Sequence, residues 1–379
     1  MQTKLRIIAF LLILSSFFSV FCIFASAKEK EDINISAKAF CLIDADSGRV
    51  LFGRNEYTRM PMASTTKIMT AIIALESGIP LSKEITVPKE AVGIEGSSIY
   101  LAEGEKITLE ALIYGLLLSS ANDSAVAIAI AVSGSVEDFV DSMNQKAFSL
   151  NLEDTHFVNP HGLYDKEHYS SAYDLARILA YCKKNENFCK ISGCSKRVFP
   201  RDDGTTRVMI NHNKLLSYDI GVIAGKTGFT KMSGRCLVSC AKRENLTLIC
   251  ATLVAPDDWN DHKKLYEFGF SNYKRVCFDA IRISIPLISG KEDHIVAESS
   301  GVSVLLPSEY ADIDTVIEAP RFLFAGLKKG DAIGRVVYSY QGKILAVSPL
   351  ILAKDATRVK YRFNLFEWLI DLIRKIKEI

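Results

Sequence analysis

Apolar and polar residues change their spacing along the chain, and each spacing predicts a different element. Two short apolar runs, residues 39–44 and 49–52, flank a polar turn with Gly48 and predict a β-hairpin. The spacing then becomes helical, and buried helices are expected near residues 68–75, 109–118, 125–132, 136–150 and 171–183. Strand patterns return at residues 236–240 and 246–253, and residues 261–270 predict a closing helix. We therefore expect an α+β domain whose sheet uses both ends of this segment.

The texture changes again at about Cys277, where apolar residues begin to alternate with polar ones in short runs. Such runs lie at residues 281–285, 302–306, 334–338 and 344–347. This rhythm predicts a separate small all-β domain. We expect a catalytic domain over residues 28–276 and a β-rich domain over residues 277–361.

The first 27 residues have the pattern of a signal peptide. Lys4 and Arg6 precede an apolar run, and Ala25-Ser26-Ala27 supplies the small residues of a cleavage site. An uncleaved membrane helix is the alternative, since about 18 apolar residues nearly span a bilayer. Either reading predicts that the rest of the chain is exported.

The last 18 residues, 362–379, predict an amphipathic helix with a wide apolar face. Its charged face carries both acids and bases, and Trp368 suits a membrane interface. We expect this helix to lie on a membrane surface, which would place the protein at the outer face of the cytoplasmic membrane. Packing of the helix on the β domain or on a partner is the alternative.

Composition excludes several classes of protein. The chain is 49% hydrophobic and 24% charged, which is typical of a globular core and not of a disordered chain. The net charge of +2 gives no reason to expect a nucleic-acid partner. Eight of the nine cysteines follow residue 27 and permit disulfides in an exported protein, but none forms a C-x-x-C pair. We expect no metal site and no cofactor.

Ser64 and Lys67 form the first candidate for chemistry. Ser64 stands at the predicted start of a helix, and Lys67 lies three positions later on the same face. A serine hydroxyl needs a base to become a nucleophile, and a lysine can serve when burial and a nearby cation lower its pKa. Ser271 and Lys274 repeat the spacing, where we expect only a helix cap and a surface lysine.

Two further motifs follow. Ser120-Ala121-Asn122 lies in a break between two predicted helices, where serine can relay a proton and the amide can hold a carbonyl or the lysine. Its alternative role is a helix N-cap. Lys226-Thr227-Gly228 precedes the predicted strand pair and can bind a carboxylate on a strand edge. A phosphate-binding loop at residues 221–227 is excluded, because it is one residue too short and two glycines interrupt the helix that should follow.

The order S-x-x-K, S-x-N and K-T-G, in helix-start, loop and strand contexts, decides the interpretation. With this trio the sequence resembles the D-alanyl-D-alanine carboxypeptidases, the low-molecular-mass penicillin-binding proteins. Segments 63–71, 159–163 and 225–230 also look like that family. The resemblance covers about residues 35–275 closely and the β domain more loosely. It implies the sheet and helical insertion of the serine β-lactamases and DD-peptidases.

The resemblance also implies a reaction. The family removes the terminal D-alanine from peptidoglycan stem peptides that end in D-Ala-D-Ala, and β-lactams acylate its serine. By resemblance, the catalytic residues are Ser64, Lys67, Ser120 and Asn122, and the substrate-binding residues are Lys226, Thr227, Gly228 and Phe229. The backbone N–H groups of Ser64 and Phe229 are expected to hold the oxyanion.

Three alternatives stay open on this fold. A class A β-lactamase needs a deacylating glutamate, and its usual E-x-x-L-N pattern is absent between the second and third motifs. A DD-endopeptidase is a further reading, because residues 253–256 lack an arginine that some family members use for the terminal carboxylate. A catalytically silent protein that binds the cell wall is the third alternative.

Overall fold

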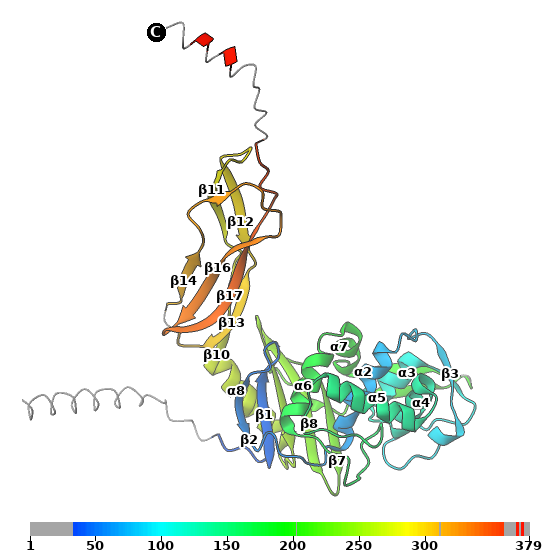
Figure 1. Ribbon diagram of the computed structural model, residues 1–379. Coiled ribbons are helices and arrows are strands. Elements are labelled where there is room, and N and C mark those ends of the chain that lie inside the picture. Colours follow the sequence, from blue (N-terminus) through cyan, green and yellow to red (C-terminus); the bar gives the residue numbers. More distant parts are fainter. Residues whose placement is uncertain (1–32, 202, 311, 360–368, 371–372, 375–379) are drawn as a thin grey trace, which may run out of the picture. The chain divides into compact units, whose positions relative to one another are not determined.

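The computed structural model describes residues 33–359 except 202 and 311, together with residues 369–370 and 373–374 (Figure 1). The expected signal peptide, residues 1–27, and most of the expected C-terminal helix, residues 362–379, lie outside the described residues. The features below belong to the compact unit Ala37–Ile379. Within the described residues, no helix combines the length and the apolar character needed to cross a membrane.

A five-stranded antiparallel sheet forms the core of the first part of the chain, in the order β2-β1-β9-β8-β7. Its strands are β1 (Ala39–Asp44), β2 (Val50–Arg54), β7 (Val222–Thr230), β8 (Gly234–Arg243) and β9 (Leu246–Leu253). β1 pairs with β9, so the sheet does use both ends of the segment, as the sequence predicts. Every residue of β1 and β9 is buried, because helices pack on the sheet and leave neither strand a solvent face.

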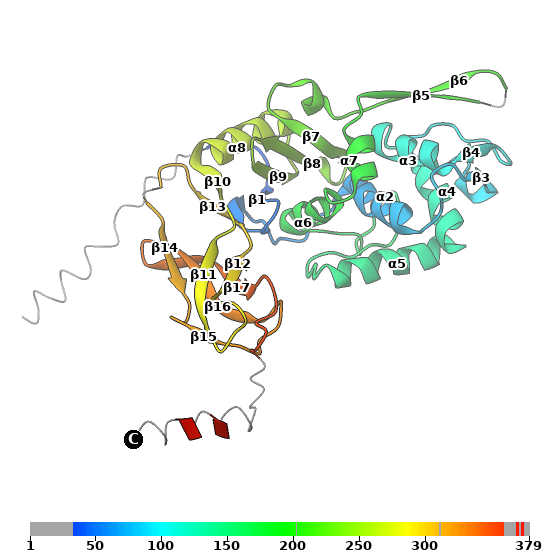
Figure 2. The same cartoon turned by 90° about the horizontal axis from the view of Figure 1, so that it is seen from above.

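Helices surround this sheet, with α8 on one face and α6 on the other (Figure 2). The helices are α2 (Lys67–Glu76), α3 (Leu109–Leu118), α4 (Asn122–Ser133), α5 (Val136–Ser149), α6 (Ala172–Cys182), α7 (Glu186–Ser192) and α8 (Asp258–Asn272). Three short 3-10 turns accompany them: η1 (Ala63–Thr66), η2 (Lys89–Ala91) and η3 (Lys214–Ser217). The expected helices are present, and α4 begins at Asn122, three residues before the predicted start.

Two small antiparallel strand pairs that the apolar pattern did not predict complete this part. They are β3 (Glu84–Thr86) with β4 (Lys106–Thr108), and β5 (Lys196–Pro200) with β6 (Thr206–Ile210). The β5–β6 hairpin extends beside α3 and the β3–β4 hairpin (Figure 2). The eight cysteines of the described residues are free thiols, and Cys41, Cys236, Cys240 and Cys250 are buried in strands of the central sheet.

The C-terminal part is all-β, as expected. A six-stranded sheet has the order β14-β16-β17-β12-β11-β15, and β10 pairs with β13. The strands are β10 (Tyr273–Phe278), β11 (Arg282–Ile288), β12 (His294–Ser299), β13 (Val302–Pro307), β14 (Asp314–Glu318), β15 (Leu323–Phe324), β16 (Ala332–Tyr340) and β17 (Lys343–Leu352). β10 crosses the expected boundary between residues 276 and 277, so strand pairing with this part begins four residues earlier.

Candidate active site

Ser64 lies in the 3-10 turn η1, directly before α2. The sequence predicts a helix start here, and the regular α-helix begins three residues later, at Lys67. The hydroxyl of Thr65 donates to the carbonyl of Met62 at 2.6 Å, and the hydroxyl of Thr66 donates to that of Ala63 at 2.8 Å. These bonds close the turn, although Ala63 adopts a left-handed backbone with φ of 48°. The serine therefore stands on a strained and tightly bonded turn.

His168 also stabilises this turn. Its Nδ1 accepts a hydrogen bond from the backbone N–H of Val158 at 3.0 Å, so Nε2 carries the proton. Nε2 then donates to the hydroxyl of Thr66 at 2.7 Å. Burial lowers the pKa of His168 to about 3, which keeps the ring neutral and the hydrogen-bond direction fixed.

Lys67 is completely buried and contacts three polar atoms. Its Nζ lies 3.0 Å from Ser64 Oγ, 2.6 Å from Asn122 Oδ1 and 2.6 Å from the carbonyl oxygen of His161. Burial, followed by the charge of Lys226, lowers the pKa of Lys67 well below its usual range. Both effects favour the neutral amine, which is the form that a general base needs.

The partners of Lys67 fix where its lone pair points. Asn122 Nδ2 donates to the carbonyl of Glu95 at 2.5 Å, so Oδ1 is the atom that faces the lysine. A neutral amine has two N–H groups, and two acceptor-only carbonyls, those of Asn122 and His161, take them. The lone pair is then left for the hydroxyl proton of Ser64.

Strand β7 carries the K-T-G motif and packs beside η1. A Cβ at Gly228 would lie 3.0 Å from the backbone nitrogen of Ser64, so only glycine lets the strand pass this close. Lys226 is buried, its Nζ donates to the carbonyl of Thr227 at 2.9 Å, and burial lowers its pKa to about 7. Its amino group is thus held against the backbone of its own strand.

A cleft of about 510 Å³ opens in front of these groups. Its lining includes five of the expected residues: Ser64, Ser120, Thr227, Gly228 and Phe229. The other three, Lys67, Asn122 and Lys226, are buried behind the cleft wall and act through their hydrogen bonds. The second S-x-x-K spacing lies elsewhere, because Ser271 is at the end of α8.

The cleft also contains residues that the sequence patterns did not single out. Arg235, on β8, lies opposite Phe229 in the strand register. Its Nε and Nη2 donate to Asp258 Oδ1 at 3.1 and 2.8 Å, and its guanidinium carbon lies 5.3 Å from the ring centre of Trp259. The register across the short turn after Phe229 was the signal that could have placed this arginine beside the K-T-G strand.

The chain is similar to known proteins in sequence. The profile of the D-alanyl-D-alanine carboxypeptidase family matches residues 25–257. The D-alanyl-D-alanine carboxypeptidase DacF of Bacillus subtilis is 32% identical over 347 residues, which cover 88% of this chain and 89% of DacF.

Solved structures agree with this match. Penicillin binding protein 5 of Haemophilus influenzae is 29% identical with a TM-score of 0.72, over 86% of this chain and 98% of that one. A D-alanyl-D-alanine carboxypeptidase of Mycobacterium tuberculosis is 30% identical with a TM-score of 0.59, over 62% of this chain and 92% of that one. The chain therefore belongs to the D-alanyl-D-alanine carboxypeptidase family of serine peptidases.

Proposed function

We propose that this protein removes the terminal D-alanine from peptidoglycan stem peptides through an acyl-enzyme on Ser64. The observation that carries the proposal is the environment of Lys67, whose two carbonyl partners leave its lone pair for Ser64. Ser64 is thus the nucleophile and Lys67 is the base that activates it. Family membership supplies the substrate class.

Arg235 offers a docking point for the terminal carboxylate of the substrate. Its bonds to Asp258 use two of the five guanidinium N–H groups, and 41% of the side chain stays exposed at the cleft. The aromatic face of Trp259 and the buried carboxylate of Asp258 fix its position. Arg235 and the Thr227 hydroxyl therefore bind the carboxylate, and Lys226 adds positive charge.

The reaction follows from these positions. Lys67 takes the hydroxyl proton while Ser64 Oγ forms a bond to the carbonyl carbon of the peptide. The backbone N–H groups of Ser64 and Phe229 stabilise the oxyanion. The C–N bond then breaks, and D-alanine leaves with a proton that Ser120 passes on. Water attacks the resulting ester and returns Ser64 to its hydroxyl form. β-Lactams enter by the same first step and stay bound as long-lived esters.

Covalent labelling with a fluorescent penicillin tests the nucleophile. The wild-type protein should take up one label, and Ser64→Ala should take up none, because the acyl group has no other attachment point. Ser271→Ala is the matched control, since it removes the serine of the second S-x-x-K spacing and should label normally. A labelled Ser64→Ala variant contradicts the assignment.

Product analysis separates this activity from its alternatives. D-Alanine released from a pentapeptide identifies a carboxypeptidase, and cleavage of crosslinked dimers identifies an endopeptidase. Rapid loss of the penicillin label identifies a β-lactamase. A protein that labels with penicillin but releases nothing from either peptide is a silent binding protein.

Arg235→Gln should raise KM for the pentapeptide at least about tenfold, because a charge-assisted bond to the carboxylate is lost.

The location of the protein is proposed from sequence alone. Residues 1–27 direct export, and residues 362–379 hold the mature protein on the outer face of the cytoplasmic membrane. Deleting residues 362–379 should move the protein from the membrane fraction to the soluble fraction. A truncated protein that stays with the membrane contradicts the anchor.

A further inference from the structure

Residues 95–101 form a segment that borders the cleft and holds the catalytic asparagine. The backbone N–H of Asn122 donates to the carbonyl of Ser97 at 2.7 Å, and its Nδ2 donates to the carbonyl of Glu95 at 2.5 Å. Ser97 itself lines the cleft. Asn122 is therefore aimed at Lys67 only while this segment keeps its place.

Asp123 holds the segment from one side. It is buried, and its carboxylate accepts hydrogen bonds from the hydroxyl of Ser98 at 2.6 Å and from the N–H groups of Ile99 and Leu101, each at 3.1 Å. A carboxylate with this many donors is a strong acceptor in a protein interior. It orders two alternate peptide units of the segment at once.

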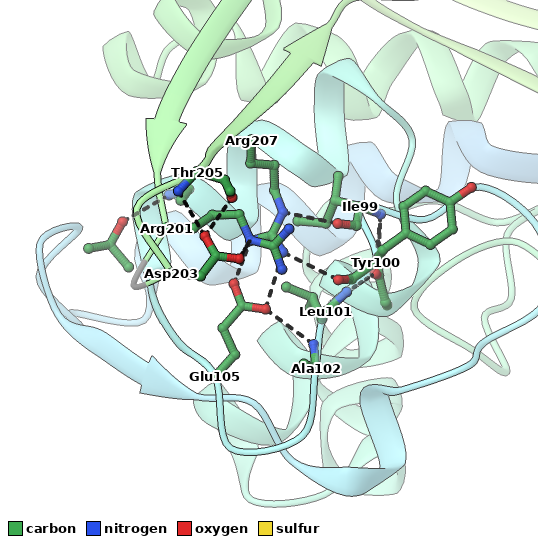
Figure 3. Close-up of polar contacts among 12 residues, drawn as sticks. Ile99, Tyr100, Leu101, Ala102, Glu105, Arg201, Asp203, Thr205 and Arg207 are labelled. Atoms are coloured by element: carbon green, nitrogen blue, oxygen red, sulfur yellow. Dashed lines mark hydrogen bonds and ion pairs between the residues drawn. The ribbon is translucent and has the colours of Figure 1, made fainter.

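Arg207, on β6, also holds the segment, through its backbone carbonyls (Figure 3). Its Nε donates to the carbonyl of Ile99 at 3.0 Å, and its Nη2 donates to that of Tyr100 at 3.3 Å. Glu105 accepts from Nη1 at 2.6 Å and from Nη2 at 3.1 Å, which fixes the plane of the guanidinium. Arg207 is only 7% exposed, so these bonds form away from bulk water.

Asp123 and Arg207 bind different polar groups of the segment. N–H groups of Ile99 and Leu101 go to Asp123, and carbonyls of Ile99 and Tyr100 go to Arg207. Between these bonds Tyr100 has a left-handed backbone with φ of 58° and a side chain that is 82% exposed. A left-handed backbone is energetically unfavourable for tyrosine, so the flanking hydrogen bonds must hold it in this conformation.

We propose that Asp123 and Arg207 are positioning residues for the reaction: together they clamp residues 98–101, which follow the two carbonyls that hold Asn122, and thereby keep the Asn122 amide against Lys67. The inference rests on the proposed function of the site. The clamp connects the β5–β6 hairpin to Lys67 through the carbonyls of Ile99 and Tyr100 and through Asn122. A loosened segment lets the amide rotate, and the Lys67 lone pair is then no longer directed at Ser64.

A double-mutant cycle between Arg207 and Asn122 tests the clamp. Arg207→Gln should slow acylation by fluorescent penicillin about tenfold in the wild-type background and less than about twofold in an Asn122→Ala background. Arg207→Lys keeps a positive charge for Glu105 but cannot reach both carbonyls, so it should behave like Arg207→Gln. Arg335→Gln is the matched control, because it removes a surface arginine paired with Glu318 in the β-rich part and should acylate normally.

Two results of this cycle overturn the proposal. One is wild-type acylation by Arg207→Gln. The other is the same loss of rate in both backgrounds, since the arginine would then act independently of Asn122. The melting temperature of each variant is measured together with the kinetics. A purely structural role of Arg207 would lower the melting temperature and give the same loss of rate in both backgrounds.

Amide hydrogen exchange tests the clamp without any activity. The N–H groups of Ile99, Leu101 and Asn122 should exchange faster in Arg207→Gln and Arg207→Lys than in the wild type, and at the wild-type rate in Arg335→Gln. Unchanged exchange in both Arg207 variants refutes the clamp. A wild-type protein that takes no penicillin label, with faster exchange in the variants, refutes the proposed function while the clamp stands.

Discussion

Lys67 and Lys226 share one site, and the pKa of each lysine is lowered there. Both are buried, and burial disfavours the charged form of each. Only Lys67 has its pKa lowered further by the other lysine, whereas that of Lys226 stays at about 7. Positive charge on Lys226 therefore favours the neutral form of Lys67, which is the form that a base needs.

A change at Lys226 should alter the pH dependence of acylation. The reaction needs neutral Lys67, so the rate is lost as the pH falls through the Lys67 pKa. In Lys226→Gln the neighbouring charge is gone and the Lys67 pKa rises, so the acid limb should move to higher pH. The measurement is the acylation rate constant for a fluorescent penicillin between pH 4 and pH 9.

Lys231→Gln is the control for that shift, because it removes an exposed lysine from the turn between β7 and β8. Its acid limb should coincide with that of the wild type. If the limb of Lys226→Gln stays in place or moves to lower pH, Lys67 is not the group that titrates.

At the scale of elements, the turn η1 is held by the loop that follows α5. The hydroxyl of Thr70, on α2, donates to the carbonyl of Pro160 at 2.6 Å, and the carbonyl of His161 accepts from Lys67. Gly162 comes next, with φ of +89°, and a Cβ there would lie 2.0 Å from the carbonyl oxygen of Ala63. The nucleophile turn and this loop fit together only because residue 162 has no side chain.

Gly162→Ala should therefore cost activity beyond its backbone strain. The methyl group must displace Ala63 and with it Ser64, and we expect acylation to slow at least about a hundredfold. Gly134→Ala is the matched control, because Gly134 has φ of +86° and open space around its Cβ position. It should lose about 1–2 kcal/mol of stability and keep the wild-type rate. Equal rates in the two variants would show that the contact with Ala63 is unimportant.

Periodicity predicted the elements whose apolar residues face the core, and it failed where burial depends on polar groups. The hairpin β1–β2 and helix α3 were predicted because apolar side chains mark their buried positions. Strand β5 is exposed at four of its five positions, so it has no apolar alternation to detect. Arg207, on β6, is buried through ion pairing, which no hydropathy pattern shows.

The same limit applied to the site. Spacing predicted Ser64 and Lys67, because a local motif keeps them one turn apart. Arg235 depends on strand register and on Asp258, which is 23 residues away in sequence, so only the folded sheet reveals it.

At the scale of the whole molecule, two buried histidines, His168 and His262, and the partly buried His161 link stability to pH. Burial lowers the pKa of His168 and of His262 to about 3, and that of His161 to about 4. His262 is a buried residue of α8 that lies within hydrogen-bonding distance of the Ser239 and Thr252 hydroxyls of the sheet. Each ring is neutral in the folded protein, while an unfolded histidine takes up a proton near pH 6.5. Their contribution to stability is therefore complete above pH 6.5 and is lost as the pH falls.

Between pH 7.5 and pH 5 the free energy of unfolding should fall by about 2 kcal/mol for each of these histidines, because the unfolded chain binds protons that the folded chain excludes. Urea denaturation at the two pH values measures this loss. His262→Gln keeps hydrogen-bonding groups near Ser239 and Thr252 but cannot titrate. Its stability should therefore be lower at pH 7.5 and should fall less steeply with pH. His294→Gln removes an exposed histidine from β12 and should keep the wild-type slope. A slope that His262→Gln leaves unchanged would mean that buried His262 does not contribute to the acid sensitivity of the fold.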